Sequence, residues 1–109
     1  MVISLGERRN RYVLYSLYQH SKTAPMGVEV LSREVAGWEN GVPPESVPDE
    51  TFEAVLDDLS RNCLPSLSYR GLVEYDPLSG LVGRPRYSLL ADRLVSLLIR
   101  IELAPFLNP

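Results

Sequence analysis

The sequence has very few residues of the kinds that build catalytic and metal sites. Its 109 residues include one histidine, His20, and one cysteine, Cys63. These residues supply no set of metal ligands and no pairing of a nucleophile with a base, and the chain has no glycine-rich phosphate loop. A single cysteine also excludes a disulfide within the chain and suits a reducing compartment. We therefore expect a protein that is not an enzyme and that uses no cofactor or metal.

Lysine is almost absent as well, and the charge balance is slightly acidic. Ten of the eleven basic residues are arginine, Lys22 is the only lysine, and the formal net charge is −3. A protein that binds nucleic acid by neutralising phosphates usually carries a net positive charge or a concentrated basic face. Any such binding by this chain must therefore come from local clusters of arginine.

Neither a secretory signal nor a membrane span is expected. Residues 1–10 lack the apolar core and the small-residue cleavage site of a signal peptide. The apolar stretch at residues 89–107 includes two arginines and two acidic residues, each of which is costly in hydrocarbon. We expect a cytoplasmic protein with no membrane contact.

The apolar pattern predicts four helices in one small domain. Apolar side chains recur at three-to-four spacing in each of them. The predicted helices span residues 7–21, residues 28–38, a segment from about Asp49 to just before Gly71, and residues 89–103.

The third of these helices is expected to lead directly into a β-hairpin. Pro65 lies inside it and predicts a kink or a restart, and Gly71 is a plausible residue to end it. Short strands are predicted at Leu72–Tyr75 and at Arg86–Leu90, joined by a loose turn. Three helices followed by a hairpin are the layout of a winged helix-turn-helix, a mainly α fold with a small β-hairpin. We expect residues 1–88 to form this domain and residues 89–109 to form a further helix, used for dimerisation.

Three short motifs in the same order resemble a winged-helix-like domain family of unknown function that is found widely in haloarchaea. They are "RRNRYVLYSL" (Arg8–Leu17), "GWEN" (Gly37–Asn40) and "LPSLSYRGLVEYD" (Leu64–Asp76). The resemblance implies a winged-helix fold and, by analogy with other winged helices, a role in transcriptional regulation. Members of that family often carry basic residues early in the third helix, whereas this chain has "ETFEAVLDD" (Glu50–Asp58).

The first hypothesis is a small DNA-binding transcriptional regulator. Its third helix would lie in the major groove of double-stranded DNA, and arginines of the hairpin would contact the backbone. Asp57 and Asp58 oppose this reading, because Asp57 is four residues before Arg61 and can pair with it. The residues predicted to contact DNA are Arg61, Asn62, Ser66, Tyr69 and Arg70 on the helix, Arg84 and Arg86 on the hairpin, and Arg8, Arg9 and Arg11 in the first helix.

The alternative is a winged helix that binds a protein partner and not DNA. Tyr12, Tyr15 and Tyr18 cannot all face inward from a helix covered on one side, so at least one is expected at the surface, where tyrosine favours interfaces. The two hypotheses differ in charge. Arginines converging on one face would favour DNA, whereas dominance of that face by Glu53 and its acidic neighbours would favour a protein partner.

The last predicted helix is apolar on more than one side, and surplus apolar surface on a terminal helix commonly packs on a second subunit. We therefore expect a homodimer. The alternative is that this helix folds back over its own domain. The residues predicted to form the dimer core are Leu90, Leu94, Leu97, Leu98 and Ile101.

Overall fold

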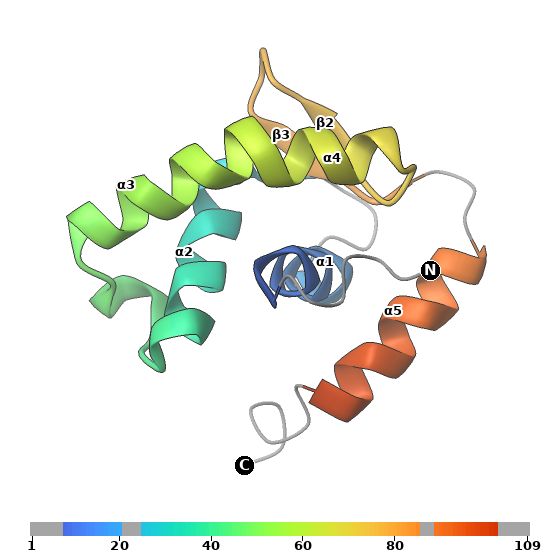
Figure 1. The fold of residues 1–109 in the computed structure, drawn as a ribbon, viewed down its shortest axis with the longest axis horizontal. Coiled ribbons are helices and arrows are strands. Elements are labelled where there is room, and N and C mark those ends of the chain that lie inside the picture. The colour runs from blue at the N-terminus through green and yellow to red at the C-terminus, as the bar shows by residue number, and fades with distance from the viewer. Residues whose placement is uncertain (1–7, 21–24, 86–88, 103–109) are drawn as a thin grey trace.

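The computed structural model describes residues 8–20, 25–85 and 89–102, the last segment with the side chains of residues 93 and 95–102 only. This part of the chain is mainly helical and has a small antiparallel sheet in the order β1-β3-β2. The elements are α1 (Arg8–His20), β1 (Met26–Gly27), α2 (Val28–Asn40), a 3-10 turn (Pro44–Ser46), α3 (Asp49–Asp58), a π-helical turn (Leu59–Cys63), α4 (Leu64–Tyr69), β2 (Glu74–Asp76), β3 (Leu81–Gly83) and α5 (Leu89–Glu102) (Figure 1).

The first helix lies at the centre of the fold. Figure 1 shows it end on, with α2, the α3–α4 segment and α5 arranged around it. The prediction that one of its tyrosines would be exposed is wrong, because Tyr12, Tyr15 and Tyr18 are 6%, 0% and 5% exposed. A helix covered on one side keeps a polar stripe in water, but a helix with neighbours on all sides buries every face.

Each of the three tyrosines faces a different neighbour. Tyr12 packs edge-on against the tryptophan of α2, with the ring centroids 5.6 Å apart. The Tyr15 hydroxyl donates a hydrogen bond of 2.6 Å to Glu102 of α5, and the Tyr18 hydroxyl donates one of 3.4 Å to the carbonyl of Leu72. A buried tyrosine needs a partner for its hydroxyl, and these contacts supply it from elements far away in sequence.

The third predicted helix forms one long segment whose hydrogen bonding changes in the middle. In the π-helical turn, the Leu64 N–H donates to the carbonyl of Leu59, five residues earlier. Pro65 follows in the first turn of α4. Proline has no N–H and its ring displaces the carbonyl four residues before it, and the extra residue of a π turn accommodates this mismatch. The predicted restart of the helix at Pro65 is confirmed.

The long segment ends in a hydrogen-bonded reversal at Gly71, as predicted. Gly71 has a φ of 77°, in the left-handed region that favours glycine. Its N–H donates to the Ser68 carbonyl at 3.0 Å, and the Leu72 N–H donates to the Leu67 carbonyl at 2.9 Å. These two bonds form a Schellman motif, which turns the chain from α4 toward β2.

The hairpin differs from the predicted one in its second strand. A strand was predicted at Arg86–Leu90, but the partner of β2 is Leu81–Gly83, and α5 has already begun at Leu89. Residues 86–88 lie outside the described part of the chain. The pattern also gave no sign of β1, which is only two residues long and pairs with β3 through Met26 and Val82.

The turn between β2 and β3 is tight, whereas a loose one was predicted. The Asp76 carboxylate accepts hydrogen bonds from the Leu78 N–H at 3.0 Å and from the Ser79 hydroxyl at 2.9 Å. The Gly80 N–H donates to the Asp76 carbonyl at 2.8 Å. Because aspartate closes the turn on its own backbone, the chain reverses several residues earlier than the pattern predicts.

The last helix packs on α1 and shares the core of the preceding residues. Val95 is fully buried, and Leu98 and Ile99 pack against the same core. The inner side of α5 therefore covers its own domain, the alternative considered for this helix. No helix in the described part of the chain is both long enough and apolar enough to cross a membrane.

Replacing Gly71 by alanine is expected to lower the free energy of unfolding by about 1 kcal/mol, because a Cβ is strained at positive φ. Gly27→Ala is the matched control. Gly27 has a φ of −71°, and a Cβ added there would meet no atom within 4 Å. Urea unfolding of both variants provides the measurement. Equal stabilities would contradict the role given to Gly71.

Candidate interaction surface

The residues of the long helix that were predicted to read DNA bases lie against carboxylates. The Arg61 Nε is 2.7 Å from the Asp57 carboxylate, so the ion pair predicted from their spacing is confirmed. The Asn62 amide donates a hydrogen bond of 2.7 Å to Asp58. Two of the five residues predicted to contact DNA from this helix are therefore engaged by acidic side chains one turn earlier.

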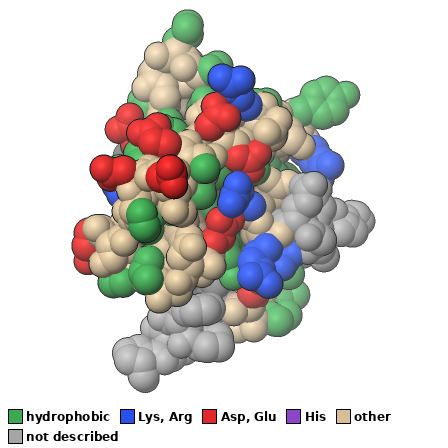
Figure 2. Space-filling view, turned by 60° about the vertical axis from the view of Figure 1, so that its left-hand side comes forward, with side chains coloured by type: hydrophobic (Ala, Val, Ile, Leu, Met, Phe, Trp, Pro, Cys, Tyr) green, Lys and Arg blue, Asp and Glu red, His purple; other side chains and the backbone are tan. Residues whose placement is uncertain are grey.

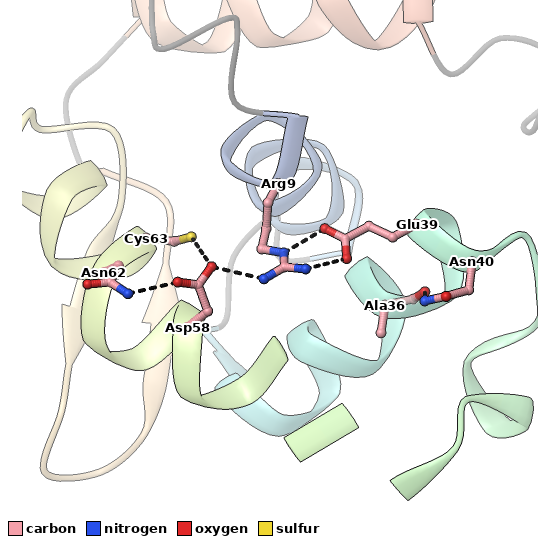
Figure 3. Close-up of polar contacts among 7 residues, drawn as sticks. All are labelled: Arg9, Ala36, Glu39, Asn40, Asp58, Asn62 and Cys63. Carbon is pink, nitrogen blue, oxygen red and sulfur yellow. Dashed lines mark hydrogen bonds and ion pairs between the residues drawn. The ribbon is translucent and has the colours of Figure 1, made fainter. Parts of the chain in front are cut away.

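Arg9 links α1 to α2 and to the end of α3. Its guanidinium donates hydrogen bonds of 2.6 Å and 2.7 Å to the two oxygens of Glu39, and a third of 3.0 Å to Asp58. Figure 3 shows it lying between the two carboxylates. The hydrogen bonds that Arg9 donates to Glu39 raise the pKa of Arg9. Arg9 therefore neutralises charge inside the domain and does not form part of an open basic patch.

The π-helical turn places two hydrogen-bond donors beside the Asp58 carboxylate. The side chains of Asn62 and Cys63, four and five residues further on, both donate to this carboxylate, the Cys63 Sγ at 3.5 Å. Cys63 is 7% exposed, which confirms the burial expected of it. The Asp58 carboxylate accepts hydrogen bonds from Asn62 and, with smaller effect, from Arg9 and Cys63. These bonds hold the pKa of Asp58 below its usual range, although burial opposes this.

Arg11 anchors α5 and does not face solvent. Its Nε and Nη2 donate to the two oxygens of Glu102 at 2.8 Å and 3.2 Å, and its side chain is only 16% exposed. The contact with Arg11 lowers the pKa of Glu102. Burial, followed by the hydrogen bond to Glu102, raises the pKa of the Tyr15 hydroxyl. The position of Arg11 in the fold therefore does not support the predicted contact with DNA.

Arg84 also packs inward. Its guanidinium lies 4.6 Å above the centre of the Tyr18 ring and donates a hydrogen bond to the Tyr18 carbonyl. This position is a correction to the predicted one on the exposed face of the hairpin, since Arg84 comes after β3 and covers the end of α1. Arg86 lies outside the described residues.

The other predicted contact residues are more accessible. Arg8 and Arg70 are exposed, and Ser66 is half-buried. Tyr69 is 94% exposed at the end of α4. Of the predicted set, Arg8, Tyr69 and Arg70 are therefore exposed to solvent, whereas Arg84 of the described residues is not.

Acidic side chains dominate the outward side of α3. Glu50, Glu53 and Asp57 are all exposed, and Figure 2 shows acidic groups gathered on this side of the molecule. The carboxylates of Glu50 and Glu53 have no hydrogen bond or ion pair to any described residue. An acidic face of this kind is the charge distribution expected for a protein partner.

Apolar side chains are exposed on α2, where Val30 is 63% exposed, and also on the hairpin and on α5. At the tip of the hairpin Leu78 is 98% exposed, and on the neighbouring strand Leu81 is 42% exposed. On α5, Leu97 and Ile101 are 53% and 69% exposed.

The residues predicted to form a dimer core therefore divide. Leu97 and Ile101 face outward, whereas Leu98 packs against the core of its own domain. The side chains of Leu90 and Leu94 lie outside the described part.

The acidic partners of the first helix were not predicted from the sequence. Glu39 lies 30 residues from Arg9, and Glu102 lies 91 residues from Arg11. Pairs so far apart leave no local pattern. The available signal was indirect: arginines at the start of a helix oppose its dipole, which a nearby carboxylate can offset.

Loss of the Asp58 carboxylate is expected to reduce both stability and its dependence on pH. A lowered pKa in the folded state stabilises the protein above the pKa of the unfolded chain, near 4, and this contribution is lost as the pH falls through the folded value. Asp58→Asn should lower the free energy of unfolding at neutral pH by about 1 kcal/mol, a figure kept small because the group is partly exposed. It should also flatten the loss of stability below about pH 5.

Asp49→Asn is the control for this measurement, because the Asp49 side chain is 97% exposed and its ion-pair distance to Arg33 is 3.9 Å. Urea unfolding between about pH 2 and pH 7 gives the two profiles. A profile of Asp58→Asn that is as steep as that of the unaltered protein would contradict the assignment.

The comparisons with known proteins identify a family but no activity. Residues 4–83 match the family described as a domain of unknown function, DUF7344. The chain matches no curated protein and no solved structure. The matched region runs from the segment before α1 to the end of β3, so it contains the acidic side of α3 and the hairpin. This chain belongs to the DUF7344 family.

Proposed function

We propose that this domain is a winged-helix module that binds a partner protein, and that its long third helix presents an acidic surface to that partner. The architecture is compatible with a winged helix. Three helical segments lead into a hairpin, and β3 of the hairpin also pairs with the short strand between α1 and α2. The long helix and the hairpin are adjacent, which is the arrangement that winged helices use for contact.

The acidic character of α3 is the observation that carries this proposal. Glu50, Glu53 and Asp57 are exposed on the part of the helix that a DNA-binding winged helix would direct toward the phosphates. Like charges facing each other are unfavourable, so this surface repels nucleic acid at the distance where contact begins. Arg61, which is exposed one turn after Asp57, is paired with that carboxylate.

The tip of the hairpin supports the same reading. Leu78 is 98% exposed, yet the turn that carries it is held by three hydrogen bonds to Asp76. A leucine on a rigid turn loses little conformational entropy when it enters a pocket on another protein. A hairpin that contacts DNA would be expected to carry arginine or lysine at this place.

DNA binding is the second candidate function, and the architecture favours it. Arg8, Arg61 and Arg70, which are exposed, would then supply phosphate contacts. The mechanism would be paired recognition helices on two half-sites, as predicted from the sequence.

Binding to random duplex DNA over a series of salt concentrations separates the two candidates. The unaltered protein is expected to show no binding at about 50 mM salt, and Asp57→Asn, which releases Arg61, is expected to bind more strongly than the unaltered protein. Fluorescence anisotropy of a labelled duplex measures both. Tight binding by the unaltered protein that weakens steeply as salt rises would overturn the proposed function and establish the second candidate.

We also propose a homodimer through the outward side of α5, where Leu97 and Ile101 lie one turn apart and are half-exposed or more. Replacing both by serine should convert a dimer into a monomer, because the apolar area that joins the subunits is removed. Light scattering after size exclusion gives the mass, with Leu78→Ser as a control that removes an exposed leucine elsewhere. An unaltered protein with the mass of one chain would rule out this dimer.

A further inference from the structure

The end of α2 combines an exposed asparagine with a glycine that follows it. Asn40 is the last residue of the helix, and Gly41 comes next in the left-handed conformation, with a φ of 67°. Asn40 also ends the motif "GWEN" (Gly37–Asn40), and of the four asparagines in the chain it alone precedes a glycine.

An asparagine before a glycine is chemically labile, because glycine has no Cβ to hinder attack by its own backbone nitrogen. That nitrogen loses its proton and forms a bond to the Cγ of the asparagine, and the side-chain amide leaves as ammonia. Water then opens the cyclic imide at either of its carbonyls. The product is aspartate or isoaspartate, in which the backbone runs through the former side chain. The reaction consumes water and releases ammonia, and it involves no oxidation or reduction.

The fold holds both of the groups that would react. The Gly41 N–H donates a hydrogen bond to the Gly37 carbonyl. The Asn40 side-chain amide donates one of 2.7 Å to the carbonyl of Ala36, one turn back along the helix (Figure 3). The attacking nitrogen therefore keeps its proton, and the leaving amide is bonded to the helix. Ring closure requires both hydrogen bonds to open.

The Gly37 carbonyl is the acceptor that closes this end of α2. Besides the Gly41 N–H, it accepts a hydrogen bond of 3.0 Å from the Val42 N–H. The returning chain lies so close that a Cβ added at Gly37 would be 2.7 Å from the Val42 carbonyl oxygen. The lack of a side chain at Gly37 thus lets the chain fold back against the helix and keep Asn40 and Gly41 in place.

We infer that Asn40 is a deamidation site, that the closed end of α2 protects it, and that isoaspartate forms there when this end opens. The modification then keeps the end open. Isoaspartate adds a carbon to the backbone, which displaces the Gly41 N–H from the Gly37 carbonyl. It also places a negative charge at the C-terminus of a helix, where the helix dipole disfavours it.

The modification also reaches the contact between α1 and α2. Glu39, the residue before Asn40, accepts two hydrogen bonds from Arg9 of α1. When the last turn of α2 loosens, this ion pair loses the backbone that positions its carboxylate. Deamidation of Asn40 is therefore expected to weaken the attachment of α2 to the central helix. This inference does not depend on the proposed function.

The first test compares the full chain at neutral pH in buffer and in urea that unfolds it. Peptide mapping follows the loss of Asn40, and methylation by an isoaspartate-specific carboxyl methyltransferase measures isoaspartate. Deamidation of Asn40 is expected to be slower in buffer by at least about tenfold. Asn62, which precedes a cysteine, is the internal reference and should persist in urea. Equal rates for Asn40 in the two solutions, or no isoaspartate at position 40 in urea, would overturn the inference.

The second test opens the end of α2 without unfolding the domain. Gly37→Ala is expected to raise the rate at Asn40 severalfold in buffer, because its Cβ displaces Val42. Gly27→Ala is the matched control, since its Cβ meets no atom within 4 Å. Equal rates in the two variants, both folded by circular dichroism, would overturn the inference. If Gly37→Ala does not fold, urea below the unfolding midpoint replaces it, and a rate that rises only with global unfolding would be the contrary result.

The third test measures what the modification does. Anion exchange separates the isoaspartate form from aged protein, and Asn40→Asp supplies the same charge on an unaltered backbone. Urea unfolding is expected to show a lower stability for both, and the lower of the two for the isoaspartate form. An isoaspartate form as stable as the unaltered protein would show that the end of α2 closes again after deamidation and would overturn that part of the inference.

Discussion

The burial of α1 from Tyr12 to Tyr18 is the constraint on which the rest of the structure depends. A helix enclosed on all sides has to find a partner for each of its polar groups, because an unpaired buried polar group is costly. Tyr15 and Arg11 find theirs in Glu102 of α5, and Arg9 finds its own in Glu39 and Asp58. The elements around α1 are thus held to it by its polar side chains as well as by its apolar ones.

This constraint explains why the arginines of the first helix form no basic patch. They are close together in sequence, but successive residues on a helix point in different directions, and each one meets a different neighbour. Arg9 points toward α2 and α3, and Arg11 points toward α5. The charges of Arg9 and Arg11 are used within the domain, while Glu50 and Glu53 keep their negative charge on the outside. A chain with a net charge of −3 consequently presents an acidic long helix to its surroundings.

Much of the fold could be predicted from the sequence, and the errors have local causes. The helices were found because apolar spacing and end signals such as Gly71 are contained within a few residues. The second strand of the hairpin was misplaced because the strands are three residues long, and the capping of the turn by Asp76 outweighs their weak pattern. Among the candidate site residues, the pair of Asp57 and Arg61 was predictable from its spacing on one helix. The positions of Arg11 and Arg84 were not, because their partners come from elsewhere in the chain.

The sequence by itself determined the helical elements, the restart at Pro65, the reversal at Gly71 and the pairing of Asp57 with Arg61. All of these depend on residues within one or two turns of each other, where backbone geometry sets the distances. The tertiary structure alone decided that the middle of α1 is buried on every side and that Arg9 and Arg11 are paired with carboxylates. Those outcomes depend on Glu39 and Glu102, which the folding of the whole chain brings to α1. The surface proposed for a partner consists of the charged groups that these internal ion pairs leave unpaired. It can therefore be identified only when the internal pairs are known.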